Sequence, residues 1–378
     1  MRLAILIYLS LSLPFDLECQ AAAGNVGIID SVPLVRFETA GDPLYQVAGG
    51  ILAGDSAVLA ERSTGMIHFF GPDGQPARTT GRLGEGPGEF RFLLWIQSVN
   101  GTLHTGDVTL RRVSQFARNG AFERSLSIKV PGNYSILAPI GVFDDGSVLV
   151  EARRFPVPHR KPETRRDVAT LFRVDSKGEA DSVGTYKLSE RYAEAFGKAG
   201  ELTTSATFGR QSGVVVASSS FYVVQNDSAV IEQYAANGKL QSLLRPATAS
   251  SLQGVRVTGG DVRAARTRFT EKGNSPSLFD RIPTPKVFPV FGWAGSHLLH
   301  LVRAHSDGTV WVVHFGGVRD SHPVWTVFNV MDGSQHEVSA PSEMDVLDSS
   351  ADRVLILRYN ENDEEIVETR RLDWRTSR

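Results

Sequence analysis

Short apolar runs separated by tight polar turns recur along most of the chain. The first copy begins with Leu44 to Leu52, turns at Gly54-Asp55, and continues through the runs at 57–60, 66–70 and 77–81. Runs of four to eight residues bounded by Gly, Asp and Asn are typical of β-strands joined in hairpins. The pattern therefore predicts a unit of four antiparallel strands.

The unit returns at intervals of roughly 45 to 60 residues, the range expected for a repeat built from one small sheet. Asn-Gly and Asp-Gly pairs between apolar runs are strong hairpin signals, since both central residues of such a turn need positive φ. These pairs stand at 73–74, 100–101, 119–120, 145–146, 237–238, 307–308 and 332–333.

The sixth unit, from Met344 to Leu372, contains only three strands before the chain stops. Residues 30–39 form a strand that has no unit of its own. Pairing the surplus strand with the incomplete unit would close a ring and remove exposed sheet edges. We therefore predict an all-β fold, a six-bladed β-propeller with four antiparallel strands per blade, closed by an N-terminal strand that completes the last blade.

Two stretches resemble a known family. The segment GRLGEGPGEF (81–90) is similar to the linker between blades in NHL-type and related bacterial exported six-bladed propellers, and the segment 352–372 looks like a closing segment of that group. The resemblance implies a polar residue, often Asp, at the end of each second strand. The matching positions here are Arg62, Asp107, Arg153, Gln225, His314 and Arg358, of which Asp107 alone keeps the family residue. The group includes scaffolds, lactonases and amidating lyases, so the resemblance leaves the activity open.

The N-terminus has the layout of a secretory signal. Arg2 precedes the apolar run Leu3 to Leu13, which is followed by Pro14 and by small residues at 21–23. We expect residues 1–23 to be a signal peptide and 24–378 to form one propeller domain in the periplasm or outside the cell. Glu18 occupies a position that lipoprotein signals fill with a small residue, so we do not expect Cys19 to anchor the chain. No later run is long and apolar enough to predict a transmembrane anchor.

Composition limits the metal sites and the partners that the chain can have. Cys19 is the single cysteine, so a chain cleaved after residue 23 has no disulfide and no cysteine-bound metal. With 40 basic and 42 acidic residues the chain is nearly neutral, which does not favour nucleic acid as a partner. Any electrostatic preference must come from local patches.

Three insertions interrupt the repeats at 153–166, 189–204 and 254–291, in connections that emerge on one face of a propeller. The first contains six basic residues and one acid, and its arginines Arg153, Arg154, Arg165 and Arg166 are candidate binding residues. The stretches 189–200 and 259–273 read as short helices, the second with Asp261 as N-cap and Gly273 as its end. The charged loops are equally compatible with solvated surface.

Two functions from different classes remain. The first is a binding module, expected to be monomeric and without a cofactor, for a small anionic ligand, a glycan or a protein. The alternative is a metal-dependent hydrolase or lyase that holds Ca²⁺ or Zn²⁺ near the propeller axis. His297 and His300 would face opposite sides of a strand, so we do not expect them to form a metal site with His305.

Overall fold

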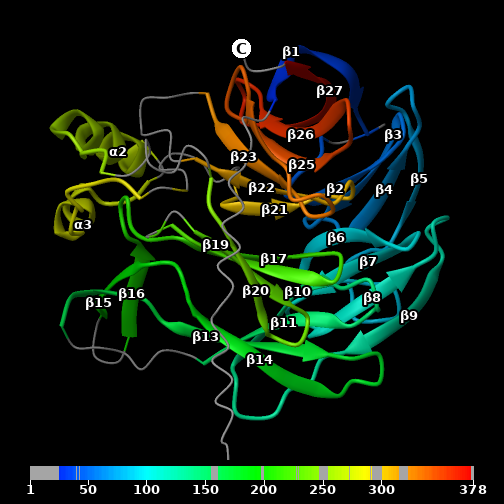
Figure 1. Ribbon diagram of the computed structural model, residues 1–378, viewed down its shortest axis with the longest axis horizontal. Helices are drawn as coiled ribbons and strands as arrows, with labels where there is room; N and C mark the ends of the chain where they lie inside the picture. The colour runs from blue at the N-terminus through cyan, green and yellow to red at the C-terminus, as the bar shows by residue number, and fades with distance from the viewer. Residues whose placement is uncertain are drawn as a thin grey trace, which may run out of the picture.

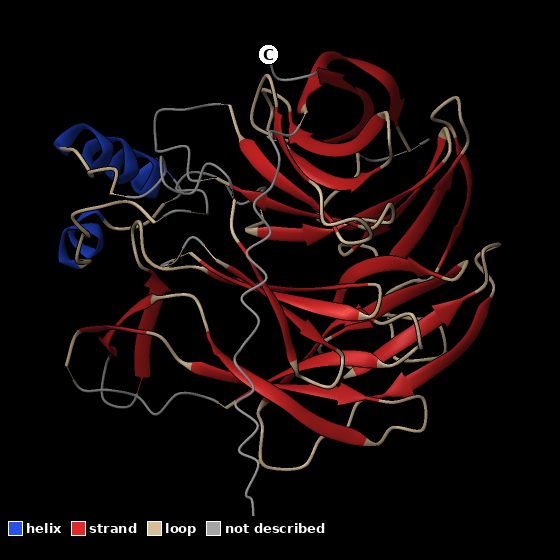
Figure 2. Cartoon of the chain, viewed as in Figure 1, coloured by secondary structure: helices blue, strands red, loops and turns tan. Residues whose placement is uncertain are grey.

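The computed structural model describes residues 25–39, 41, 43–154, 161–196, 200–226, 228, 230–246, 254–271, 273–289, 291, 300–314 and 322–375. The predicted signal peptide lies outside these residues. The described chain is almost entirely β-structure, and its helices are confined to one side of the molecule (Figure 2). Within the described residues, no helix is long and apolar enough to cross a membrane.

Four sheets each contain four consecutive antiparallel strands, as the repeat predicts. The first sheet contains β2 (Val47–Ala53), β3 (Ser56–Glu61), β4 (Met66–Phe70) and β5 (Pro76–Thr80). The second contains β6 (Leu93–Val99), β7 (Thr102–Asp107), β8 (Arg112–Phe116) and β9 (Phe122–Ser127). The third contains β10 (Ile136–Val142), β11 (Val148–Arg153), β13 (Val168–Val174) and β14 (Ala180–Lys187). The fourth contains β17 (Ser212–Ala217), β18 (Ser220–Gln225), β19 (Ile231–Ala235) and β20 (Leu240–Leu244).

The fifth and sixth repeats join in one eight-stranded sheet, in the order β21-β22-β23-β24-β1-β27-β26-β25. The fifth repeat supplies β21 (Val302–Ala304), β22 (Thr309–Val313), β23 (Val324–Asn329) and β24 (Gln335–Ser339). The C-terminal repeat supplies β25 (Asp345–Ser349), β26 (Arg353–Tyr359) and β27 (Glu365–Arg375). The N-terminal strand is β1 (Val26–Phe37), which lies beside β27 at the top of Figure 1.

The N-terminal strand pairs antiparallel with β27 from Val26↔Arg375 to Phe37↔Val367, which confirms the predicted pairing of the two chain ends. It begins earlier than expected, and its first residues also pair in parallel with β24. The register of β1 shifts on both sides of Pro33, a residue that cannot donate to a ladder. The resulting bend lets the start of β1 cover the edge of β24, which explains why two predicted sheets merge.

Buried aromatic and aliphatic side chains fill the spaces between sheets. Trp311 and Trp325 are both buried, with ring centroids 5.9 Å apart. The glycines of the predicted turns adopt positive φ, 80° at Gly146 and at Gly308. Of the residues that precede these glycines, only Asn100 also has positive φ, so most of these turns are not the two-residue type that the Asn-Gly and Asp-Gly pairs predicted. The 81–90 segment connects β5 to β6, so it links two sheets as the family resemblance implied.

The first strands of successive sheets pack side by side. Gly213 of β17 faces β21 so closely that a Cβ there would lie 2.6 Å from the Val302 side chain. Gln97 of β6 bonds both the N–H and the C=O of Val142 in β10. The N–H of Leu52 in β2 donates to Asp348 of β25 at 2.8 Å. These contacts arrange the sheets in a β-propeller-like fold.

The insertions form a layer beside the sheets, and one prediction there is wrong. The described residues of 189–200 are not helical, because β15 (Arg191–Phe196) pairs with β16 (Gly200–Ser205) as a hairpin and β12 (Glu163–Arg165) adds a third strand. Pairing of β15 with β16 satisfies the backbone groups of both segments, and the β-branched Thr203 and Thr204 of β16 suit a strand better than the helix that the composition suggested.

The predicted second helix is present as α2 (Gly259–Glu271), followed by α3 (Pro276–Arg281). Its cap differs from the prediction. Thr258 accepts the Asp261 N–H through its hydroxyl, while the Asp261 carboxylate accepts the N–H and O–H of Thr258. Thr258 is therefore the N-cap, and Asp261 completes a reciprocal capping box. Gly273 follows the helix with φ of 79°, as predicted for its end.

Candidate functional site

The residues predicted at the ends of the second strands do stand at strand ends, but their side chains are engaged within the chain. The buried Asp107 carboxylate accepts the N–H groups of Arg91, Phe92 and Leu110 at 2.8–3.0 Å. The Asp107 carboxylate therefore fixes the backbone that leads into β6, and few of its acceptor positions remain for a ligand.

Arg62, Arg358 and His314 are also held by neighbours. Arg62 donates to the Leu93 carbonyl at 2.8 Å, and Arg358 bonds the buried carboxylate of Glu368 at 3.0 and 3.3 Å. His314 contacts the Thr326 hydroxyl, and burial lowers its pKa to about 4. These side chains stabilise the strands around them.

Two of the four candidate arginines have side chains held by several bonds within the chain, and the other two are more exposed. Arg165 makes two 2.7 Å bonds to the Glu201 carboxylate, and Arg166 donates to the Leu188 carbonyl and to Ser212, with a longer bond of 3.3 Å to Gln225. Arg153 is half-exposed and pairs with the buried Glu151. Arg154 is exposed, with its guanidinium 5.4 Å from the Tyr134 ring centroid.

The three insertions contact one another and gather on the left of Figure 1, where β15, β16, α2 and α3 lie. Arg165 of the first insertion bonds Glu201 of the second, and Arg281 of the third bonds Glu194 at 2.7 and 2.9 Å. Tyr192 packs in one buried cluster with Leu278 of α3. We call the unit of β12, β15, β16, α2 and α3 the insertion layer.

A second candidate region lies where the first strands meet the turns that follow them. A pocket of about 210 Å³ opens there, lined by residues of all six repeats. Asp348 is buried at its wall and accepts hydrogen bonds from Leu52 N–H, Ser306 N–H and the Ser306 hydroxyl at 2.7–2.8 Å. Burial raises the pKa of Asp348 to about 6, although these donors oppose the shift.

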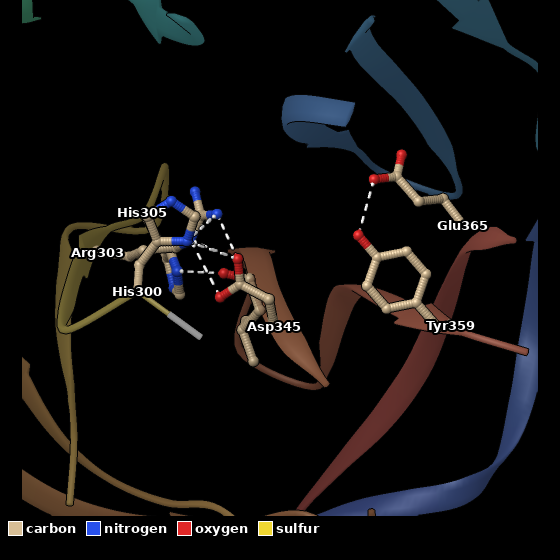
Figure 3. Close-up of polar contacts among 7 residues, drawn as sticks. His300, Arg303, His305, Asp345, Tyr359 and Glu365 are labelled. Carbon is tan, nitrogen blue, oxygen red and sulfur yellow. Dashed lines mark hydrogen bonds and ion pairs between the residues drawn. The ribbon is translucent and has the colours of Figure 1, made fainter. Parts of the chain in front are cut away.

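A titratable cluster lies at the opposite end of the same strands (Figure 3). His300 Nδ1 lies 2.9 Å from Asp345 Oδ2, and the Arg303 guanidinium bonds the same carboxylate. Burial raises the pKa of Asp345, but Arg303 and His300 outweigh burial and hold it at about 2. In the same view Tyr359 donates to Glu365 at 3.2 Å.

Sequence reasoning missed Asp345 and Asp348. A usable signal existed, because the run MDVLDS (344–349) places two carboxylates in a strand that is otherwise apolar. Of the three histidines considered together, His297 lies outside the described residues, and His305 bonds Ser349 Oγ at 2.8 Å. Among the described residues, no group of three or more His, Cys, Asp or Glu side chains is placed to hold a metal ion.

No family model matches the chain, and no curated protein matches it in sequence. Among solved structures, it resembles a member of the DUF4221 family from Bacteroides vulgatus, with 9% identity and a TM-score of 0.48 over 94% of this chain and 100% of that chain. A gluconolactonase from Xanthomonas campestris matches with 12% identity and a TM-score of 0.43 over 91% and 100%. The calcium-binding protein regucalcin from Agrobacterium tumefaciens matches with 9% identity and a TM-score of 0.40 over 93% and 97%. Identities of 9–12% and TM-scores of 0.40–0.48 do not establish a function for this chain.

Proposed function

We propose that the chain is an exported six-bladed β-propeller that acts as a binding module and engages an anionic ligand or partner through the insertion layer. Six blades follow from dividing the eight-stranded sheet where β24 meets β1, a contact of only three residue pairs. Each half then contains four strands, like the other four sheets.

The observation that carries the binding proposal is the assembly of three separate insertions into one ordered layer. Ordering long loops costs roughly 1–2 kcal/mol of backbone entropy per residue. Because the insertion layer lies outside the sheets and is nevertheless ordered, we infer that it has a role in recognition. Its carboxylates are largely used internally, since Glu194, Glu201 and Asp280 each pair with an arginine of the layer or of its adjoining strand.

Several arginines of the insertions and their flanks remain exposed. Arg154, Arg191, Arg256 and Arg263 are exposed, and Arg191 donates to Thr203 within its own hairpin. Arginine suits sulfate, phosphate and carboxylate groups because its planar fork can donate two parallel bonds. Arg154 is kept as a residue to test, and Arg191, Arg256 and Arg263 replace Arg153, Arg165 and Arg166, whose bonding is internal.

The test is retention on immobilised heparin, a polysulfated probe, with neutral dextran as a blank. Replacing Arg154, Arg191, Arg256 and Arg263 by Gln should shift elution to clearly lower salt. Each substitution removes one ion pair with the heparin sulfates, so less salt is needed to displace the protein. A matched control removes four charges elsewhere, at Arg118, Lys129, Arg371 and Arg375, all exposed. Equal losses in the two variants would reduce the effect to net charge and refute the proposal.

A hydrolase or lyase is the second candidate, favoured by the His300–Asp345 contact. A buried carboxylate that orients an imidazole is a common arrangement for general acid–base chemistry. The residues in the described part of the chain do not fit a Ca²⁺ or Zn²⁺ site, so we derive no step through a metal. Elemental analysis of dialysed protein tests the metal-dependent form directly, and a stoichiometric metal would favour this candidate over the binding module.

A further inference from the structure

The pocket at the end of the first strands is the recess to which all six repeats contribute. Its wall is formed by the ends of β2, β6, β17 and β25 and by the turns after β10 and β21. Pockets for drug-sized ligands occupy roughly 300–1,000 Å³. A volume of about 210 Å³ therefore suits a smaller molecule, of the size of a monosaccharide.

Hydrophilic groups dominate the chemistry of this pocket. Hydroxyl groups come from Ser98, Ser218 and Ser306, and amide groups come from Gln97 and Asn100. The Gln97 amide is bonded to both backbone groups of Val142, Ser306 Oγ donates to Asp348, and Asn100 Nδ2 donates to the Asp144 carbonyl. The Ser98 and Ser218 hydroxyls and the Asn100 amide oxygen therefore provide the donors and acceptors for the hydroxyls of a ligand.

The charged side chains that line the pocket are acidic. Asp144 and Asp348 line the pocket, and no lysine or arginine is among its described lining residues. The histidine of the wall, His305, is buried, and burial lowers its pKa to about 4, so it adds no positive charge near neutral pH.

Asp144 is the carboxylate available to a ligand. Its backbone is fixed on two sides, since its N–H donates to the Ser218 carbonyl at 3.1 Å and its carbonyl accepts from Asn100 Nδ2 at 3.0 Å. Its side chain is exposed, and the carboxylate that shapes its own turn is the neighbouring Asp145, which accepts the Ser147 N–H. The turn thus presents Asp144 without needing its carboxylate.

We propose that this pocket binds a small hydroxylated amine, of the amino-sugar class, with the ammonium group on Asp144 and the hydroxyls on Ser98, Ser218 and the Asn100 amide oxygen. The site is distinct from the insertion layer, and its ligand has the opposite charge. Binding of an amine in this pocket can therefore be tested independently of the anionic partner proposed above.

Three probes of matched size test the charge preference: glucosamine, glucose and gluconate, titrated calorimetrically into the purified protein. Because Asp144 is exposed and its charge is screened by water, glucosamine should bind about two- to fivefold more tightly than glucose, and gluconate should bind most weakly. Asp144→Asn should abolish the preference for glucosamine over glucose.

Asp175→Asn is the control, because Asp175 lies in the β13–β14 turn of the same sheet and its carboxylate serves only that turn. It should leave all three affinities unchanged. Gluconate binding as tightly as glucosamine, an unchanged preference in Asp144→Asn, or no glucosamine binding in the millimolar range would each overturn the proposal. Displacement of glucosamine by Ca²⁺ at equal concentration would assign the site to a bare cation and overturn the amino-sugar class.

Discussion

The buried carboxylate of Asp348 makes the stability of the protein depend on pH in an unusual direction. Burial raises its pKa from 3.8 to about 6, which means that the folded state retains the proton over a range where the unfolded chain has lost it. The folded state is therefore favoured by this group at low pH, and the advantage disappears as pH rises from about 4 through 6. A shift from 3.8 to about 6 corresponds to about 3 kcal/mol at 1.36 kcal/mol per pKa unit.

Asp348→Asn isolates this contribution, because asparagine resembles the protonated acid in shape and does not titrate. We expect the free energy of unfolding of the variant, minus that of the wild type, to increase by about 3 kcal/mol between pH 4 and pH 7. Urea unfolding at several pH values, followed by tryptophan fluorescence, measures this difference. Other titrating groups cancel, since they are present in both proteins.

Asp175→Asn supplies the comparison. Hydrogen bonds from Glu179 and Lys177 N–H lower the pKa of Asp175, so it stays ionised in both folded and unfolded states above pH 5 and its variant should show a flat difference there. A flat or falling difference for Asp348→Asn would refute the reasoning. It would mean that the three donors from Leu52 and Ser306 stabilise the carboxylate by more than burial costs.

Two further predictions follow from side chains with defined partners. Trp311→Ala, in the cluster with Trp325, should lower the free energy of unfolding by about 3–5 kcal/mol in urea titrations, and a loss below 1 kcal/mol would contradict its core position. Arg165→Lys cannot reproduce the two parallel bonds to Glu201, so hydrogen exchange in β15 and β16 should accelerate while the global free energy of unfolding changes little. Unchanged exchange in this hairpin would contradict the view that the pair holds the insertion layer together.

The strands were predictable because each repeat combines an apolar run with a turn that demands positive φ. The runs at 57–60 and 66–70, which form β3 and β4, and the turns at Gly146 and Gly308 were located from these signals alone. The pairing of the chain ends was also predictable, since a surplus strand and an incomplete unit leave edges that must be covered. The merger through β24 was not predictable, because it depends on the bend at Pro33.

The site could be predicted only in part, because the role of a charged side chain depends on the residue that it pairs with, and the sequence does not show that residue. Arg165 and Arg154 belong to the same basic stretch, yet Arg165 is bonded to Glu201, 36 residues away, and Arg154 is exposed. Asp348 and Ser306 meet across 42 positions in sequence, which no local pattern encodes. Residue type indicated the available chemistry, and the three-dimensional pairing determined where it can be used.

Closure of the fold and the proposed amine pocket depend on the same contacts. Asp348 links the last repeat to Leu52 of the first sheet and to Ser306 of the fifth, and both Asp348 and Ser306 line the pocket. A ligand that binds only the folded state stabilises it by about 2.7 kcal/mol at one hundred times its dissociation constant. Because the wall of the pocket is the junction of three sheets, that stabilisation would act where the first and last repeats meet. Binding of a ligand in the pocket would therefore be thermodynamically linked to the contacts that Asp348 makes with Leu52 and Ser306.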